Sequence, residues 1–302
     1  MSYKIITGAN DSYILTLLNF IKYHIQNCVI RLEDLIVYDL GLNENNLQSL
    51  ENILNNKTEI KKLNFDEYPE HVDLKKYNGL YCSYAFKPII IYNEANIRNN
   101  IPVIWLDCAC NITINILNQM INSINNNGVY SPVGNFEKTI ETIELNHPQT
   151  TSLLGLTKHE HFNELQTRLA GIFGVNYSNF NGKIILDDWY KYSLNKDIII
   201  PEGSSRNNHR QDQTILSCIM FLHQKKYNII FEKSIFGISC FNKFDKSDYE
   251  NNYNKYALIE KNNGKQLSII YEKTIDEAIK IYCHRKQCNI NYFNQYFHVI
   301  KI

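Results

Sequence analysis

Short apolar runs with β-strand character alternate with helical segments through the first hundred residues. Tyr3–Thr7 is a run of β-type residues that ends at Gly8, and apolar residues then recur at helical spacing from Tyr13 to Tyr23. Further strands are expected at Asp34–Leu40, Ile60–Phe65 and Pro102–Leu106, and further helices at Leu47–Leu54 and Pro88–Ile97. Four such alternations predict an α/β fold with a mostly parallel sheet flanked by helices.

The second half of the chain is less regular. Its expected elements are a strand at Gly128–Pro132, helices at Phe162–Phe173, Ile184–Leu194 and Gln213–Leu222, a strand at Tyr227–Phe231, a strand at Leu267–Tyr271 and a helix at Ile275–Tyr282. No Pro- or Ser-rich linker separates these elements. We therefore expect one domain over 1–302, in which 251–302 is an irregular C-terminal extension.

The charge balance and the cysteines exclude several classes of protein. With 31 Lys+Arg against 31 Asp+Glu the net charge is zero, which argues against a dedicated nucleic-acid or anionic-membrane binder. No apolar run approaches the roughly 20 residues that span a bilayer, and the N-terminus lacks a secretory signal, so we expect a cytoplasmic location. The eight cysteines form no CxxC pair and are expected to be reduced thiols. Zinc held by Cys108, Cys110 and a distant His is the alternative.

Asn, Ile, Lys and Tyr are abundant, while Ala, Gly and Pro are scarce. The codons of the abundant residues are AT-rich, so genome composition explains the bias better than any Asn-based chemistry. Such a composition suits a giant virus or an AT-rich microbe, and a viral chain would lie in the host cytoplasm.

Polar residues follow several of the expected strands. In open α/β sheets, ligands bind beyond the carboxyl ends of the strands. Four places meet this condition: Thr7–Asp11 after the first strand, Asp39 with Gly41 after the second, Asp107 after the fourth, and His209–Gln213 at the start of a late helix. Each also has a purely structural interpretation as a turn or a helix cap. The first segment is not the GxGxxG of dinucleotide-binding proteins.

The segment His209–Gln213 combines an imidazole, a guanidinium, a carboxylate and two amides just before an apolar helix. At a helix N-terminus the macrodipole would keep Asp212 ionised, and an ionised carboxylate in a cleft can accept the proton of a hydroxyl. Arg206, Arg210 and His209 could face phosphate groups, which the guanidinium fork matches. The structural alternative is that Asp212 caps the helix and the other residues form a solvated loop.

Five segments in this order carry a family resemblance: ITGANDSY, IVYDLGL, YAFKPIII, PVIWLDCAC and HRQDQTILS. Together they resemble GT-A glycosyltransferases, which are Rossmann-like enzymes that use nucleotide sugars. More narrowly, they are similar to glycosyltransferase-like proteins of nematode, plant and giant-virus genomes. The resemblance extends to about Phe231 and implies a nucleotide-binding half at 1–125 and an acceptor and catalytic half at 126–250.

The resemblance also implies roles for single residues. The nucleotide sugar would be bound by Thr7, Gly8, Ala9, Asn10, Asp39, Lys87, Asp107 and Arg210, and the acceptor by Trp189, His209 and Gln211. Asp212 would be the catalytic base that deprotonates the acceptor hydroxyl in inverting enzymes. Lys87 would contact the sugar or the diphosphate; a lysine lying along its own helix toward solvent is the alternative. Asp107 matches the first acid of the Asp-x-Asp motif, which holds Mn²⁺ or Mg²⁺ against the diphosphate.

The sequence departs from the family at the second acid of that motif. Ala109 stands there and supplies no side-chain oxygen for a hard cation. Three alternatives follow: Asp107 binds the metal with a carboxylate from elsewhere, such as Asp187 or Asp188; Arg or Lys neutralises the diphosphate instead; or the site is inactive. His147, His159 and His161 could lie in the acceptor or metal region, but a structural role is expected for each of them and for Trp105.

The leading hypothesis is a glycosyltransferase that moves a sugar, with inversion, from a nucleoside diphosphate sugar to a hydroxyl of a glycan or glycoprotein acceptor. The second hypothesis is a catalytically inert nucleotide-sugar-binding or scaffold protein of the same fold, motivated by Ala109. A Rossmann methyltransferase is disfavoured, because no Gly-rich loop follows the first strand.

Overall fold

The computed structural model describes residues 2–74, 83–133, 145–156, 164–205, 208–231, 239–240, 254–262, 264, 266–272, 274–276, 278–279 and 290–301. The chain divides into two compact units, Met1–Phe241 and Asn242–Ile302. Each unit is described by itself. Among the described residues, no helix combines the length and the apolar character needed to cross a bilayer.

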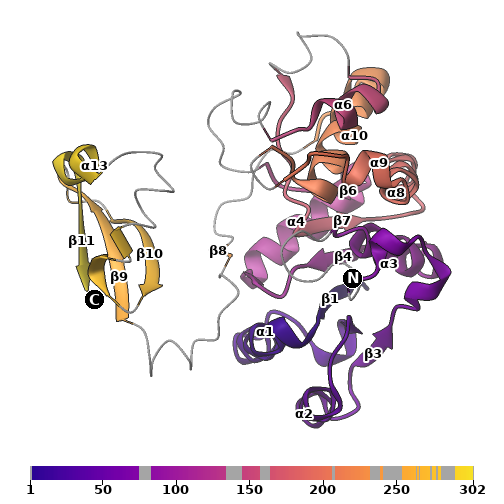
Figure 1. Cartoon of the computed structure of the whole chain (residues 1–302). Helices are drawn as coiled ribbons and strands as arrows, with labels where there is room; N and C mark the ends of the chain where they lie inside the picture. The colour runs from indigo at the N-terminus through magenta and orange to yellow at the C-terminus, as the bar shows by residue number, and fades with distance from the viewer. Residues whose placement is uncertain are drawn as a thin grey trace. The chain divides into compact units, whose positions relative to one another are not determined.

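The larger unit contains a six-stranded sheet in the order β3-β2-β1-β4-β7-β6 (Figure 1). Its strands are β1 (Lys4–Ala9), β2 (Leu35–Asp39), β3 (Glu59–Lys62), β4 (Val103–Leu106), β6 (Val129–Tyr130) and β7 (Ile172–Val175). The first four strands along the chain pair in parallel, whereas β7 is antiparallel to both β4 and β6. The mostly parallel α/β sheet expected from the alternating pattern is therefore confirmed.

Helices cover both faces of this sheet. They are α1 (Ile14–Gln26), α2 (Glu44–Leu54), α3 (Phe86–Ile97), α4 (Ile114–Asn127), α6 (Pro148–Leu153), α8 (Phe180–Ser193), α9 (Lys196–Ile199) and α10 (Gln211–Tyr227), with short 3₁₀ turns at Asp11–Tyr13, Leu32–Asp34, Phe65–Glu67 and Glu70–Val72. Successive strand residues point to opposite faces, so Ile6 packs in one core cluster with residues of α3, α8 and α10, while Ile5 packs in another with residues of α1 and α4.

The abundant asparagines shape the ends of several helices. Asn43, Asn179 and Asn195 are N-caps whose side chains accept backbone N–H bonds, and Asn55, Asn56 and Asn228 adopt the left-handed backbone conformation. Asn is well suited to both positions, because its short amide bonds to nearby backbone and tolerates positive φ. Codon bias explains why asparagine is abundant, and in the structure these asparagines lie where helices begin and end.

Two elements expected from the sequence are wrong. Within Phe162–Phe173, the described residues 165–171 are not helical and Ile172 begins β7. Because β7 lies between β4 and β6 and is buried along its whole length, its apolar residues carry no alternation that would distinguish a strand from a helix. The expected strand Tyr227–Phe231 is instead the end of α10 followed by a left-handed Asn228. His159, His161 and Arg206 lie outside the described residues.

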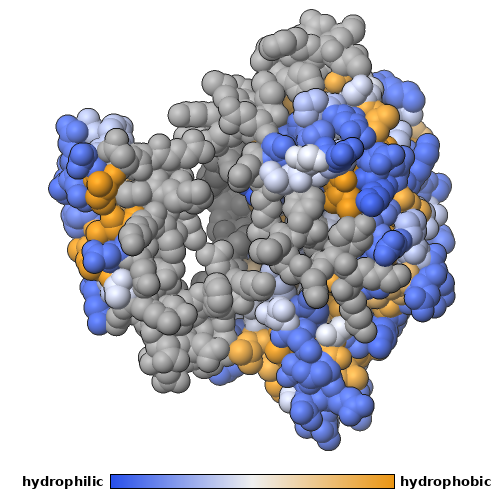
Figure 2. Space-filling model, viewed as in Figure 1, coloured by the Kyte–Doolittle hydropathy of each residue, from blue (hydrophilic) through white to orange (hydrophobic). Residues whose placement is uncertain are grey.

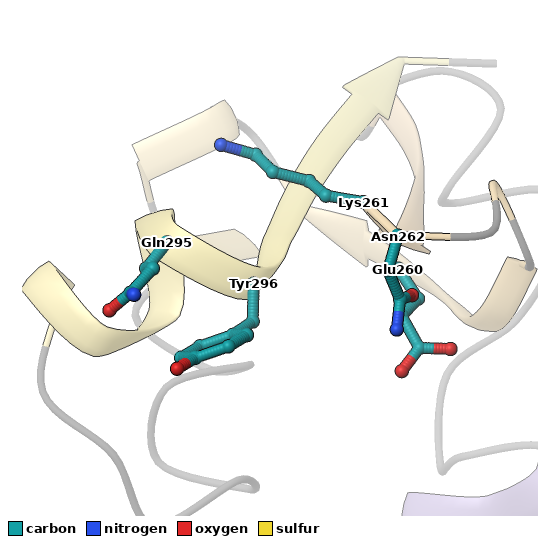
Figure 3. Close-up of a pocket in the computed structure, with 5 residues that line it drawn as sticks. All are labelled: Glu260, Lys261, Asn262, Gln295 and Tyr296. Carbon is teal, nitrogen blue, oxygen red and sulfur yellow. The ribbon is translucent and has the colours of Figure 1, made fainter.

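The smaller unit has an antiparallel sheet in the order β10-β9-β11, formed by β9 (Asn254–Glu260), β10 (Gln266–Glu272) and β11 (Phe297–Lys301), with α13 at Ile290–Tyr296. Its core contains Tyr256, Leu258, Ala278, Phe293 and Val299. A surface hollow of about 240 Å³ lies between the end of β9 and the end of α13, lined by Glu260, Lys261, Asn262, Gln295 and Tyr296 (Figure 3). The Lys261 ammonium donates to the backbone oxygen of Asn294.

The described surface in the view of Figure 2 is largely hydrophilic, with separate hydrophobic areas. The most exposed large apolar side chains include Ile97, Phe180 and Ile230, which come from the end of α3, the start of α8 and the segment after α10. Single exposed apolar residues are normal on folded proteins.

Candidate functional site

One lysine lies between two aspartates that come from distant parts of the sequence. The Nζ atom of Lys87, in the first turn of α3, is 3.1 Å from Oδ1 of Asp107 and 3.2 Å from Oδ2 of Asp212. Asp107 follows β4 directly, and Asp212 is in the first turn of α10. Three of the residues that the sequence singled out are therefore in direct contact, although more than a hundred positions separate two of them.

Lys87 is held in place by burial and by aromatic rings. Its side chain is 5% exposed, and its ammonium lies 5.6 Å from the ring centre of Tyr84 and 6.0 Å from that of Trp105. Burial alone would lower the pKa of Lys87, but Asp107 and Asp212 outweigh it and hold the pKa above its ordinary value. The ammonium is therefore charged at neutral pH. The alternative that Lys87 extends toward solvent is wrong.

Asp107 is the exposed member of the group, because 40% of its side chain is accessible. Oδ1 of Asp107 accepts a hydrogen bond of 2.6 Å from the Trp105 indole. The backbone N–H of Asp107 donates to the backbone oxygen of Gly171, the residue directly before β7. A Cβ atom on Gly171 would lie 2.6 Å from Oδ2 of Asp107. The carboxylate of Asp107 is thus held by the Trp105 indole on one side, and on the other side it fits closely against Gly171, where a side chain would collide with it.

Asp212 is buried and incompletely bonded. Its side chain is 6% exposed, and Oδ2, which faces Lys87, accepts no well-aligned hydrogen bond from the described residues. Burial raises the pKa of Asp212 to about 6, against the lowering effect of Lys87. The pKa of Asp212 is thus shifted in the direction opposite to that expected from the helix macrodipole. A carboxylate with this pKa is ionised near pH 7 and is a competent proton acceptor there.

Gln211 precedes Asp212 and has an unusual backbone. Its φ is +44°, a left-handed value that is uncommon for a residue with a long side chain, and its buried Nε2 atom has no hydrogen-bond partner. Strained backbone and unpaired buried polar atoms concentrate at ligand sites, since the surrounding fold must compensate for them. Among the described residues, the start of α10 therefore has one unpaired donor, on Gln211, next to the carboxylate of Asp212 that faces Lys87.

A second polar group lies at the ends of β1 and β2. Gly8 and Ala9 belong to β1 rather than to the turn that was expected there, and Ala9 pairs with Asp39. Oδ1 of Asp39 accepts the N–H groups of Gly41 and Leu42 at 2.8 and 2.7 Å, so this carboxylate holds the loop after β2. The buried atoms Oγ1 of Thr7 and Oδ1 of Asn10 have no hydrogen-bond partner among the residues that the structure describes.

The register of the sheet relates the two polar groups. β1 pairs with β4 in parallel, with Ile6 opposite Trp105. Continued for two residues, this register puts Gly8 level with Asp107, so both groups lie on the same edge of the sheet. This edge is where ligands bind in open α/β proteins.

Trp189 and His209 are buried in the protein rather than exposed to an acceptor. The Trp189 indole donates to the backbone oxygen of Asp212 at 3.0 Å. His209 donates from Nε2 to the oxygen of Ile199, and its Nδ1 accepts from the N–H of His147. Burial lowers the pKa of His209 to about 4, so the ring is neutral. Trp189 thus binds the first turn of α10 directly, and His209 links the residues just before α10 to Ile199 and His147.

The other residues assigned from the sequence have mixed surroundings. Arg210 is partly exposed, and its backbone N–H donates to Thr214. Asp187 accepts from Tyr177 and Lys183, and Asp188 is 2.7 Å from Nε2 of His223. These two carboxylates, proposed as additional metal ligands, are thus bonded to other groups.

The side chains present do not fit a divalent ion held by the protein. Cys108, next to Asp107, offers a thiol, whereas Mg²⁺ and Mn²⁺ prefer oxygen ligands. No group of three or more His, Cys, Asp or Glu side chains that could hold a metal occurs within the described part of the chain. Asp107 is the one accessible carboxylate of the group, and it is already bonded to Trp105 and Lys87.

Two residues of the site were not identified from the sequence. Gly171 has no local signal, because its role depends on the pairing of β7 with β4. Trp105 was expected to be structural, yet its indole bonds to Asp107. The alternation of a strand offers a signal here, since residues 105 and 107 fall on the same face of the extended chain.

No protein-family profile matches the sequence, and no curated protein matches it. Among solved structures, the chain is similar to the galactosyltransferase LgtC in complex with donor and acceptor sugar analogues, with a TM-score of 0.43 and 15% identity over 72% of this chain and 70% of that one. The mannosyltransferase Ktr4p from S. cerevisiae in complex with GDP has a TM-score of 0.45 and 12% identity, covering 79% and 70% of the two chains.

Core-mannan synthase A from Aspergillus fumigatus, in its Mn and GDP form, has a TM-score of 0.43 and 8% identity, covering 73% of this chain and 69% of that one. The names of these structural neighbours are those of glycosyltransferases. TM-scores below 0.5 and identities this low place the chain in no family.

Proposed function

We propose that this protein transfers a sugar from a nucleoside diphosphate sugar to a hydroxyl group. The observation that carries the proposal is the group formed by Lys87, Asp107 and Asp212 at the carboxyl edge of the parallel strands. It combines a buried cation for a leaving diphosphate with a carboxylate of raised pKa for a proton. The sequence resemblance to GT-A glycosyltransferases supports the same function.

The donor would lie along the edge of the sheet. Its base and ribose would contact the ends of β1 and β2, where Thr7 and Asn10 offer unpaired polar atoms. Asp39, Gly8 and Ala9 would shape this part of the pocket. The diphosphate would then reach Lys87 and Arg210, with the exposed carboxylate of Asp107 directed to a hydroxyl of the donor.

The chemistry follows from the position of Asp212. Its carboxylate accepts the proton of the acceptor hydroxyl as the oxygen of that hydroxyl bonds to the anomeric carbon. The bond from that carbon to the diphosphate oxygen breaks, and its electron pair leaves with the diphosphate beside Lys87. Direct displacement of this kind inverts the anomeric centre. All three acceptor candidates are buried, but Trp189 and His209 are hydrogen-bonded inside the protein. For the acceptor we retain Gln211 alone, because its Nε2 atom has no partner among the described residues.

A catalytically inert nucleotide-sugar-binding protein is the second candidate. It is favoured by the burial of Asp212, whose side chain is 6% exposed and paired with Lys87. A cytoplasmic location, a viral source and the narrower resemblance to nematode, plant and giant-virus proteins stay predictions from the sequence.

A ligand screen followed by one substitution tests the proposal. Thermal unfolding is measured with uridine diphosphate, guanosine diphosphate and S-adenosylmethionine, and we expect stabilisation by one nucleoside diphosphate. Asp212→Asn should then lower sugar transfer or donor hydrolysis by a hundredfold or more while nucleotide binding is retained. Asp197→Asn, at an exposed position of α9, is the matched control and should leave turnover unchanged.

The outcomes separate the candidates. Unchanged turnover in Asp212→Asn would exclude this residue as the base. Nucleotide-sugar binding without any turnover in the unmodified protein would favour the inert binding protein. Stabilisation by S-adenosylmethionine alone would contradict both.

A further inference from the structure

The cation position of the site is filled by a side chain of the protein itself. Of the four carboxylate oxygens of Asp107 and Asp212, three face Lys87: Nζ is 3.1 and 3.4 Å from the two oxygens of Asp107 and 3.2 Å from Oδ2 of Asp212. Oδ1 of Asp107 also accepts from the Trp105 indole. A Mg²⁺ or Mn²⁺ site normally supplies several oxygen ligands at roughly 2.0–2.2 Å. Here the oxygens are directed to an ammonium.

Lys87 cannot easily give up this position. Its side chain is 5% exposed and is enclosed by the rings of Tyr84 and Trp105. A divalent ion bound to Asp107 would lie within a few ångström of this ammonium and would have to compete with it for the same carboxylate oxygens.

The ammonium retains capacity for a ligand. A lysine has three N–H donors, and the described contacts use them on two carboxylates. The contact with Oδ2 of Asp107 is the longest of the three, at 3.4 Å, so a ligand oxygen that enters beside Asp107, the exposed side of the group, would take the donor now directed to that oxygen. The helix α10 also begins here, and the N-terminus of a helix favours negative charge.

We propose that Lys87 takes the place of the divalent cation, so that this protein binds the diphosphate of its nucleotide without a metal ion. This inference rests on the proposed function, because it assumes a nucleoside diphosphate ligand. It adds that the charge of the leaving diphosphate is met by a lysine fixed between two aspartates.

Calorimetric titration with uridine diphosphate and guanosine diphosphate tests the inference without any assay of turnover. We expect the preferred nucleotide to bind with the same affinity, within about threefold, in EDTA and in excess Mn²⁺. Lys87→Met should weaken diphosphate binding at least tenfold in EDTA, and Mn²⁺ should not restore it. The same variant should bind the corresponding nucleoside, which has no phosphate, as the unmodified protein does.

Two further variants keep the test decisive. Lys87→Arg retains the positive charge and should recover part of the diphosphate affinity, which shows that charge rather than packing is responsible. Lys61→Met removes a lysine paired with a different buried carboxylate, Glu94, and should change neither the affinity nor its response to Mn²⁺. If Lys87→Met does not fold, the EDTA and Mn²⁺ titrations of the unmodified protein decide alone.

The possible failures are distinguishable. An affinity of the unmodified protein that rises tenfold or more with Mn²⁺ overturns the metal-free binding and leaves the proposed function intact. Diphosphate affinity in Lys87→Met equal to that of the unmodified protein does the same. If neither nucleotide binds with or without Mn²⁺, the proposed function fails, and this inference fails with it.

Discussion

Two buried carboxylates of the larger unit have opposite surroundings. Glu94, in α3, is almost fully buried and accepts hydrogen bonds from the Tyr38 hydroxyl at 2.6 Å and from Lys61 at 2.7 Å, with a further bond from Arg98. Asp212 shares one ammonium with Asp107, and its Oδ2 accepts no well-aligned hydrogen bond. The carboxylate of Glu94 is paired with two cations, Lys61 and Arg98. In the other group the carboxylates of Asp107 and Asp212 share a single cation, Lys87.

This difference separates a structural ion cluster from a candidate binding site. The bonds of Glu94 join α3 to β2 through Tyr38 and to β3 through Lys61, and Arg98 continues the network to Glu59 at 3.0 Å. A fully bonded buried ion stabilises the elements that it joins, but it has no capacity left for a ligand. Asp212 has that capacity, and its raised pKa is the energetic cost.

The largest predicted difference is in stability. Glu94→Gln should lower the free energy of unfolding by about 4 kcal/mol, because it leaves Lys61 and Arg98 without their buried partner. Asp212→Asn should change it by about 1 kcal/mol or less, because it removes an ion that burial already disfavours. Urea denaturation of both variants measures the two values. Equal losses in the two variants would contradict the distinction between the clusters.

The buried, uncharged side chain of His24 allows a test of stability against pH. His24 donates from Nδ1 to the oxygen of Phe20 and accepts at Nε2 from Ile112, and burial lowers its pKa to about 4 from an ordinary 6.5. Between these values the unfolded chain binds a proton that the folded chain does not bind. The stabilising effect is complete above pH 6.5 and is lost as pH falls toward 4, by up to about 3 kcal/mol.

His24→Asn should therefore be less stable than the unmodified protein at pH 7.5, and the difference should shrink as the pH falls toward 4.5. Urea denaturation at several pH values gives both curves. His298→Gln, at an exposed position of β11, is the control and should shift stability by the same amount at every pH. A difference for His24→Asn that does not vary with pH would show that the ring does not titrate in this range.

The smallest predicted effect comes from a single methyl group. Gly171→Ala would bring Cβ to 2.6 Å from Oδ2 of Asp107, so the carboxylate must shift from the position in which it contacts Lys87. We expect nucleotide affinity to fall about five- to tenfold, equivalent to about 1 kcal/mol. Gly174→Ala, in β7 three residues further along the chain, is the matched control, because the added methyl there meets the side chain of Ile124 instead. It should affect stability but not binding; equal losses of affinity in the two variants would contradict the role of Gly171.

Much of the sheet could be predicted from local patterns, whereas the details of the site could not. The spacing of apolar residues in β1, β2, β4 and their helices is a local property, and it gave the parallel core correctly. β7 was interpreted as part of a helix, because a strand buried on both faces has no alternation. Its antiparallel insertion beside β4 then decides that Gly171 faces Asp107.

The sequence by itself determined which side chains stand at the ends of the strands, because side-chain direction and strand ends follow from periodicity and turn residues within a few positions. It also identified Lys87, Asp107 and Asp212 as candidates, each with a structural alternative. Only the tertiary structure decided that one ammonium lies between both carboxylates, that burial raises the pKa of Asp212, and that Trp189 and His209 are enclosed. Burial, pairing and charge state are properties of the surroundings, and those surroundings are assembled from segments more than a hundred residues apart.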